Sequence, residues 1–281
     1  MGICYGKKAK LRLDAYLTEQ GLFETCSRAQ AAIMAGQVLV DEVKIDKPGT
    51  SVKEGAKIRI LGDQLRYVSR GGLKLAKALQ KFPVSVAGKV MADIGASTGG
   101  FTDCALQNGA VRVYAIDVGY GQLDWKLRND PRVINMERTN ARLLEADSLP
   151  EPIEAASIDV AFISLEKILP AVRKLLAADA FVIALVKPQF EAGKENVGKK
   201  GVVRDPAVHK EVLRRIIAFA EQEGFGIGGL DYSPVKGPEG NIEYLLYLTA
   251  TPAKNVSDTR LSLADIDRLV SESHAILDNK G

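Results

Sequence analysis

The chain has 281 residues, of which 46% are hydrophobic and 26% charged, and its formal net charge is +3. This composition is typical of a soluble protein with one large hydrophobic core and room for a smaller one. No apolar run approaches the roughly 20 residues that cross a bilayer. The N-terminal stretch MGICYGKKAKLR lacks the apolar core and cleavage site of a secretory signal, so we expect a cytoplasmic protein.

Cysteine and histidine are scarce in the sequence. Cys4, Cys26 and Cys104 are scattered and form no CxxC pair, so neither a disulfide framework nor a zinc site is expected. The two histidines, His209 and His274, leave little room for histidine-based catalysis or metal binding. The sequence therefore predicts no metal site.

Residues 1–61 form a candidate first domain, in which basic side chains outnumber acidic ones. In the stretch 11–22, apolar residues at helical spacing predict a helix, with Gly21 as its stop signal. A second helix is expected between Ser27 as N-cap and Gly36 as C-cap. Short alternating strands are expected over 37–46 and 56–61. A basic module of this kind favours an anionic partner such as nucleic acid. A linker is expected over 62–70.

Residues 71–252 form a candidate second domain, in which strand and helix patterns alternate. Strands are expected over 88–95, 111–119, 131–137, 157–164, 180–186, 225–233 and 241–249. Helices are expected over 70–82, 101–109, 121–130, 167–176 and 209–224. This alternation predicts a doubly wound α/β fold with a mostly parallel sheet and an antiparallel last strand. A helical tail is expected over 253–281, capped by Ser262 with Asp265.

The first strand of this domain leads into the glycine-rich segment DIGASTGGF. Gly95, Gly99 and Gly100 allow the backbone to approach a ligand closely before a helix begins. Asp117 ends the next strand, where an acid suits the two hydroxyls of a ribose. The glycine spacing differs from GxGxxG, and the segment has no basic residue for a pyrophosphate. The pattern favours a nucleoside cofactor without phosphates, such as S-adenosylmethionine, over a turn that binds nothing.

Charged residues fall where several predicted strands end. The apolar run 180–186 is typical of a strand buried on both faces, and Pro188 ends that strand at Lys187. Asp159 lies near the end of the preceding strand, and Glu243 begins the antiparallel last strand, so all three are expected at one edge of the sheet. Lys74 can join them from the helix before the first strand. Taken singly, each is also explained as a cap, a rim charge or a solvated lysine.

These residues belong to motifs that resemble a known family. The blocks YVSRGGLKL, DIGASTGGFTD, DVGYGQL, ERTNAR, LVKPQFE, GVVRDP and GNIEY resemble the TlyA branch of the FtsJ-like class I methyltransferases over about residues 67–250. The block RLDAYL, with SRAQAAIMAGQVLVD after it, resembles an S-four-like RNA-binding domain. The turn DEVK lacks the glycine usual in that domain, so we expect a wider hairpin there.

The resemblance implies 2′-O-methylation of cytidine in ribosomal RNA, with S-adenosylmethionine as methyl donor and ribosomal RNA or ribosomal subunits as partner. It maps a catalytic tetrad onto Lys74, Asp159, Lys187 and Glu243. It also implies a set of residues that line the cofactor site, namely Asp93, Gly95, Ser97, Gly99, Asp117 and Asn140. The basic face of the first domain offers a set of side chains for RNA phosphates, namely Arg12, Arg28, Lys44 and Lys47.

A mechanism follows as a hypothesis. A ribose hydroxyl is a poor nucleophile at neutral pH, so a base assists methyl transfer. We expect Lys187 to be that base or the main partner of the hydroxyl, the two acids to orient it, and Lys74 to position the nucleotide. Burial and a neighbouring lysine lower the pKa of a lysine, whereas neighbouring acids raise it, and the sequence leaves this balance open. The glycine- and lysine-rich segment from Lys194 to Asp205 is expected to be mobile and to close over RNA.

Three other functions are compatible with parts of the sequence. One is a catalytically silent RNA-binding factor for ribosome assembly, which the complete tetrad disfavours. Another is a membrane-active haemolysin, which the lack of a membrane span and of a basic amphipathic terminus disfavours. The third is a dehydrogenase, which the glycine spacing disfavours.

Overall fold

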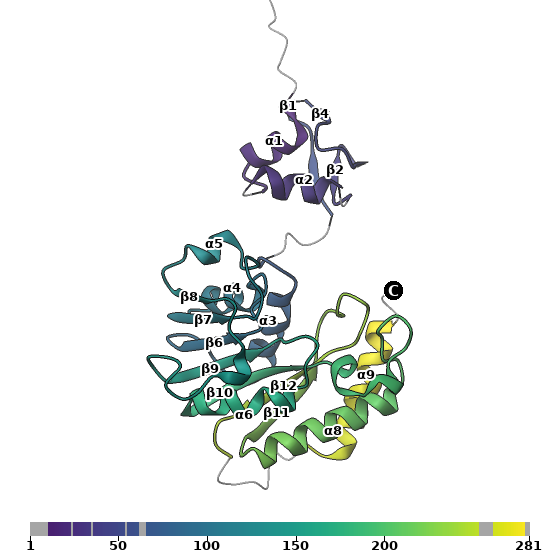
Figure 1. Cartoon of the computed structure of the whole chain (residues 1–281). Helices are drawn as coiled ribbons and strands as arrows, with labels where there is room; N and C mark the ends of the chain where they lie inside the picture. Colours follow the sequence, from purple (N-terminus) through teal and green to yellow (C-terminus); the bar gives the residue numbers. More distant parts are fainter. Residues whose placement is uncertain are drawn as a thin grey trace, which may run out of the picture. The chain divides into compact units, whose positions relative to one another are not determined.

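The computed structural model divides the chain into two compact units, Met1–Arg66 and Tyr67–Gly281 (Figure 1). The structure describes residues 11–23, 25–34, 36–53, 55–61, 66–252 and 261–278. Cys4 and the first part of the expected linker lie outside the described residues.

The first unit packs two helices against short strands. The helices are α1 (Leu13–Glu19) and α2 (Cys26–Met34). The strands are β1 (Leu11–Arg12), β2 (Val38–Val40), β3 (Val43–Ile45), β4 (Ser51–Val52) and β5 (Ile58–Ile60), which pair as β1-β4 and as β3-β2-β5. Apolar side chains from both helices and from β2 and β4 form its core, including Leu13, Leu17, Ile33 and Val38.

Two expected helix boundaries in this unit were wrong. Residues Leu11 and Arg12 pair with β4, so the first helix begins at Leu13. The second helix begins at Cys26, which places Ser27 inside its first turn rather than at the N-cap. Gly36 was correctly expected after its end, since it has a φ of 67° and donates its N–H to the carbonyl of Ile33.

The hairpin between β2 and β3 is tight, which corrects the expectation of a wider turn. Val40 pairs directly with Val43, so only Asp41 and Glu42 form the turn. Their φ angles are 51° and 66°, as a two-residue hairpin requires. The Asp41 carboxylate accepts the N–H of Lys57 at 2.9 Å, and Glu42 pairs with Arg59. These neighbours hold two non-glycine residues in a conformation that favours glycine.

We predict that Glu42→Gly stabilises the first unit. Removing one left-handed non-glycine residue gains about 1 kcal/mol, and the exposed pair with Arg59 contributes less than that. Urea unfolding of the full chain measures the change. Asp46→Gly, at an exposed position without a positive φ, is the control and should destabilise. Equal destabilisation by both substitutions would contradict this account of the turn.

The second unit is built on a seven-stranded sheet. Its strands are β6 (Val90–Ile94), β7 (Arg112–Ile116), β8 (Val133–Met136), β9 (Ile153–Ile158), β10 (Leu176–Val186), β11 (Gly226–Tyr232) and β12 (Tyr244–Thr249). Their order is β11-β12-β10-β9-β6-β7-β8. β12 runs antiparallel to both β10 and β11, as the sequence predicts, and the other strand pairs in this sheet are parallel.

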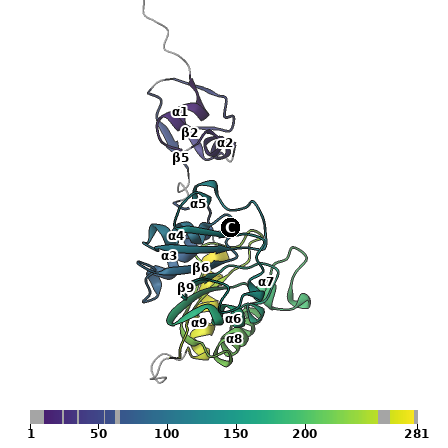
Figure 2. The ribbon, with the colours of Figure 1, turned by 60° about the vertical axis from the view of Figure 1, so that its left-hand side comes forward.

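Helices cover both faces of this sheet (Figures 1 and 2). The α-helices are α3 (Gly71–Lys81), α4 (Gly100–Gln107), α5 (Trp125–Arg128), α6 (Leu169–Leu175), α7 (Pro188–Glu191), α8 (Pro206–Gln222) and α9 (Leu263–Asp278). The 3₁₀ turns are η1 (Ala141–Leu143), η2 (Leu165–Lys167) and η3 (Lys194–Asn196). One core lies between the sheet and α6, α8 and α9, and the other lies against α3, α4 and α5.

Strand β10 contributes to both cores, as its apolar run predicts. Val182, Ala184 and Val186 belong to the first core, whereas Ile183 and Leu185 belong to the second. The expected strand over 157–164 was wrong, because β9 ends at Ile158 and the chain turns away after it. The expected helix over 121–130 is reduced to the single turn of α5.

The C-terminal helix α9 has the expected cap. Ser262 donates its N–H to the carboxylate of Asp265 at 3.1 Å, and the Ser262 hydroxyl accepts the N–H of Asp265 at 3.2 Å. None of the helices among the described residues has the length and apolarity that a membrane crossing needs.

Candidate active site

The site lies where the strand order reverses, between β6 and β9. In an open α/β sheet a crevice forms at this point, beyond the carboxyl ends of the strands. The N–H of Asp159, just after β9, donates to the carbonyl of Ile94 at 2.9 Å. A Cβ on Gly95 would lie 2.6 Å from the carbonyl oxygen of Asp159. Gly95, with a φ of 83°, therefore allows the two chain segments to meet closely.

The rest of the glycine-rich loop is equally restricted. Gly99 has a φ of 92°, and a Cβ there would overlap the side chain of Leu127. A Cβ on Gly100 would overlap the hydroxyl of Ser69. Neither glycine can therefore be replaced by a larger residue without moving its neighbours.

Two acids hold the loop in place. Asp117, at the end of β7, accepts the N–H of Ser97 at 2.8 Å and that of Gly119 at 2.7 Å. Each carboxylate oxygen keeps a lone pair for a further donor such as a ribose hydroxyl. Asp93 is fully buried beneath the loop and accepts hydrogen bonds from Thr102 and Ser157 rather than facing the crevice. Burial raises the pKa of Asp93 to about 6, although these hydrogen bonds lower it in part.

Four charged side chains meet beside the loop. Asp159 bridges two ammonium groups, because its Oδ1 lies 2.5 Å from Nζ of Lys187 and its Oδ2 lies 3.6 Å from Nζ of Lys74. The same Nζ of Lys74 lies 2.7 Å from Oε2 of Glu243. Lys74, Lys187 and Glu243 are buried, and Asp159 is nearly so. The structure therefore brings together all four residues that the sequence placed at this edge.

Electrostatics distinguish the two lysines. Burial alone would lower the pKa of Lys74, but Asp159 and Glu243 together outweigh it, so the pKa lies above its ordinary value. Among the described residues, Lys187 pairs with a single acid, Asp159, and its ammonium also lies 5.9 Å from the ring centroid of Phe190. Lys74 thus stays protonated at neutral pH, and Lys187 is the lysine with fewer acidic partners.

A cavity of about 330 Å³ opens over this cluster. Its size is at the lower end of small-molecule sites. Gly95, Ser97 and Gly100 line it together with the four charged residues. Gly99 is the N-cap residue of α4, and Asn140 caps η1, where it accepts the N–H of Arg142 at 3.2 Å.

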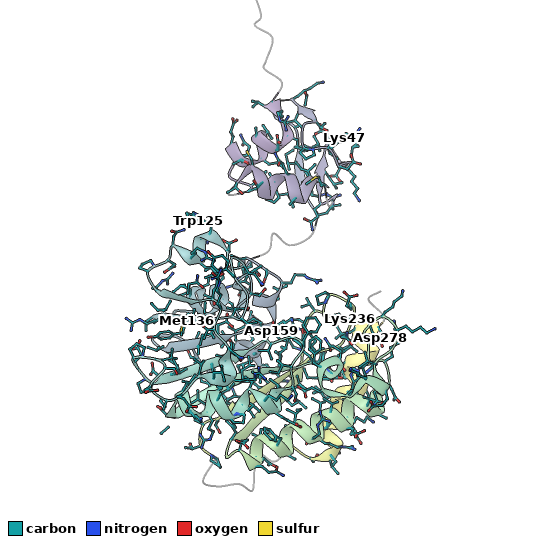
Figure 3. The ribbon with its side chains drawn as sticks, viewed as in Figure 1. Lys47, Trp125, Met136, Asp159, Lys236 and Asp278 are labelled. Atoms are coloured by element: carbon teal, nitrogen blue, oxygen red, sulfur yellow. The ribbon has the colours of Figure 1, made fainter. Side chains whose placement is uncertain are left out.

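Sequence reasoning missed several residues of the cavity wall. Ser69 and Arg70 precede α3, and Val235, Lys236 and Pro238 lie in the loop before β12. Lys236 is held by an ion pair of 2.8 Å with Asp278 of α9, and both residues are marked in Figure 3. The proline- and glycine-rich sequence SPVKGPEGN, which ends two residues before Glu243, was the available signal.

The expected linker also contributes to the site. Tyr67 is buried, and the N–H of Val68 donates to the Asp103 carboxylate at 2.8 Å. A Cβ on Gly72 would overlap the ring of Tyr67. From Tyr67 onward the chain therefore packs on the second unit and leads directly into α3 and Lys74.

The four predicted RNA-binding residues belong to the first unit. Arg12 donates to Asp14 through Nε at 3.1 Å and Nη2 at 2.7 Å, so its charge is partly engaged. Lys44 and Lys47 are exposed, and Figure 3 marks Lys47. Arg28 lies in α2, and its side chain is outside the described part of the structure.

Comparisons with known proteins identify the class. Residues 67–250 match the model of the FtsJ-like methyltransferases, and residues 11–58 match the S4 domain. The chain therefore belongs to the FtsJ-like methyltransferase family, and its sheet order with an antiparallel β12 is that of a class I methyltransferase.

Its relatives place it among the TlyA proteins. It is 55% identical over 272 residues to YqxC of Bacillus subtilis, whose name proposes an rRNA methyltransferase, with 96% of each chain covered. It is 42% identical to TlyA of Mycobacterium tuberculosis, named a 16S/23S rRNA (cytidine-2′-O)-methyltransferase, over 94% of this chain and 98% of that one. A solved structure from Streptococcus thermophilus, described as a proposed haemolysin, is 47% identical to this chain. The match has a TM-score of 0.74 and covers 98% of this chain and 99% of that one.

The buried carboxyl of Asp93 predicts a pH dependence of stability. Its pKa is raised in the folded state, so its destabilising effect is absent below about pH 4 and grows as pH rises through 6. The substitution Asp93→Asn removes the charge and keeps an acceptor for the hydrogen bonds. Its advantage in free energy of unfolding should therefore grow by about 3 kcal/mol between pH 4 and 7. Urea titrations at several pH values measure it, and a constant difference would contradict the assignment.

Proposed function

We propose that this protein transfers a methyl group from S-adenosylmethionine to the 2′-hydroxyl of a cytidine ribose in ribosomal RNA. The observation that carries the proposal is the buried bridge of Lys187, Asp159 and Lys74 beside the glycine-rich loop. The names of its TlyA relatives support the nucleotide and the RNA class. Such an enzyme would act in the cytoplasm on ribosomal RNA or ribosomal subunits.

The residues of the crevice fit S-adenosylmethionine. The loop of Gly95, Ser97 and Gly99 gives close backbone approach, Asp117 offers acceptors for ribose hydroxyls, and the loop carries no cation that would select a phosphate. When bound, this cofactor supplies an electrophilic methyl group. Asp93 supports the loop from below, and Asn140 remains a proposed contact at the start of η1.

Lys187 is the proposed partner of the attacking hydroxyl. It directly follows β10, whose residues 180–186 are all buried, so its backbone is held at a fixed place beside the cavity that its side chain lines. Asp159 orients it by a contact of 2.5 Å. Lys74 reaches the same carboxylate from the other side, at 3.6 Å. Lys187 would serve there as the base for the attacking 2′-hydroxyl or as its main hydrogen-bond partner.

Lys74 and Glu243 have a different proposed role. Lys74 contacts two carboxylates and keeps its proton, so it serves as a fixed donor toward the nucleotide rather than as a base. Glu243 is buried, and its charge compensates that of Lys74. The cluster thereby places two lysines with different acidic partners beside the loop, and the main contribution of both is positioning.

We predict that Lys187→Met abolishes methyl transfer and spares cofactor binding. Loss of a positioned base lowers the rate by about 10²–10⁴-fold. The measurement is incorporation of tritiated methyl groups into unmethylated small and large ribosomal subunits, with cofactor affinity determined by calorimetry. Lys167→Met, at an exposed lysine of η2, is the control and should retain the wild-type rate. Wild-type transfer by Lys187→Met would remove the proposed role of Lys187.

A further inference from the structure

A basic turn lies within the segment from Lys194 to Asp205, which the sequence predicts to be mobile and to close over RNA. The segment between η3 and α8 carries Lys199, Lys200 and Arg204, and all three side chains are exposed. None of them forms an ion pair with another described residue. They line a hollow of about 350 Å³, which Asp205 also borders. The Asp205 carboxylate accepts the N–H of Ala207 at 2.8 Å and so caps α8. Three cations therefore share a concave surface with one engaged acid.

The turn is tied down more firmly than its glycine- and lysine-rich sequence suggests. Asn241 is buried, accepts the N–H of Val203 at 3.0 Å and donates its amide to the carbonyl of Gly201 at 2.8 Å. His209 contacts the carbonyl of Val203 at 3.0 Å from α8. Within the turn, the N–H of Gly198 donates to the carbonyl of Val202 at 3.1 Å. These bonds present the three cations on a fixed backbone.

The same asparagine connects the turn to the candidate active site. The backbone carbonyl of Asn241 accepts the N–H of Gly237 at 2.9 Å, and Gly237 lines the cavity. Asn241 also lies two residues before Glu243 in the chain. From the other side, the turn follows β10 and Lys187 in the chain, after α7 and η3. One buried amide thus fixes the basic turn relative to the charge cluster.

We propose that Lys199, Lys200 and Arg204 form a phosphate-binding surface for the RNA strand that flanks the methylated nucleotide. This inference rests on the proposed function, because it assigns the RNA backbone as the partner. A concave group of cations that pair with no acid in the described part of the chain suits phosphates better than an apolar ligand. The fixed placement lets these contacts set the register of the strand relative to Lys187 and reduces the entropy lost on binding.

The test compares two triple variants. Lys199→Gln/Lys200→Gln/Arg204→Gln removes the surface, and Lys174→Gln/Arg214→Gln/Arg268→Gln removes three exposed charges that are ion-paired elsewhere. Each lost phosphate contact reduces the slope of log affinity against log salt by about 0.7–0.9. For the first variant we expect a slope smaller by about 2, a KM for RNA raised at least tenfold, and unchanged cofactor affinity and kcat at saturating RNA. The second variant should behave like wild type.

Two outcomes would overturn the proposal. They are an unchanged slope and KM in the first variant, and an equal loss in both variants. RNA binding is measured separately from methyl transfer. A wild-type protein that binds RNA with the expected slope but transfers no methyl group would contradict the proposed function and leave the basic surface supported.

The variant Asn241→Ala tests whether the fixed position of the turn matters as well as its charge. It removes the hydrogen bonds that hold the turn and keeps all three cations. Release of the turn should raise the KM for RNA and reduce the salt slope, with cofactor affinity and circular dichroism unchanged. An unaltered slope would remove the role assigned to the asparagine.

Discussion

The architecture of the site depends on Asp159, which neutralises two buried ammonium groups with one carboxylate. Its contacts with Lys74 and Lys187 join α3 to the end of β10. A buried lysine without a partner would lose its proton or destabilise the fold by about 3–5 kcal/mol. Glu243 completes the balance of two positive and two negative charges. The cluster is therefore stable only when all four segments are in place.

The backbone around Asp159 is equally constrained. Gly95 allows the end of β6 to contact the backbone of Asp159. The glycine-rich loop and the charge cluster therefore meet at this contact. Around this point, Asn241 and Lys236 connect the cavity wall to the basic turn and to α9. Elements from the whole second unit thus determine where a hydroxyl and a methyl donor can meet.

Much of this arrangement follows from sequence. The apolar run before Lys187 predicts a strand buried on both faces, and alternating elements predict the sheet edge at which the four charged residues meet. The helix before the first strand offers Lys74 as a fourth member, and the resemblance to TlyA proteins assigns it to the tetrad. The roles of these residues are proposals that rest on their geometry.

Other features depend on contacts that a sequence pattern does not contain. The end of β9 at Ile158 is set by pairing with β6 and β10, so the apolar residues after it suggested a longer strand. The tight turn at Asp41 and Glu42 depends on Lys57 and Arg59 from β5 and its approach. The buried position of Asp93 and the hydrogen bonds of Asn241 depend equally on partners that are distant in sequence.

The most direct test of the central claim is the chemical identity of the product. Purified small and large subunits that lack ribose methylation would be incubated with the protein and S-adenosylmethionine, and the RNA digested to nucleosides for mass spectrometry. The account predicts 2′-O-methylcytidine from one or both subunits. A base-methylated nucleoside, or no methylated product despite demonstrated cofactor binding, would contradict it.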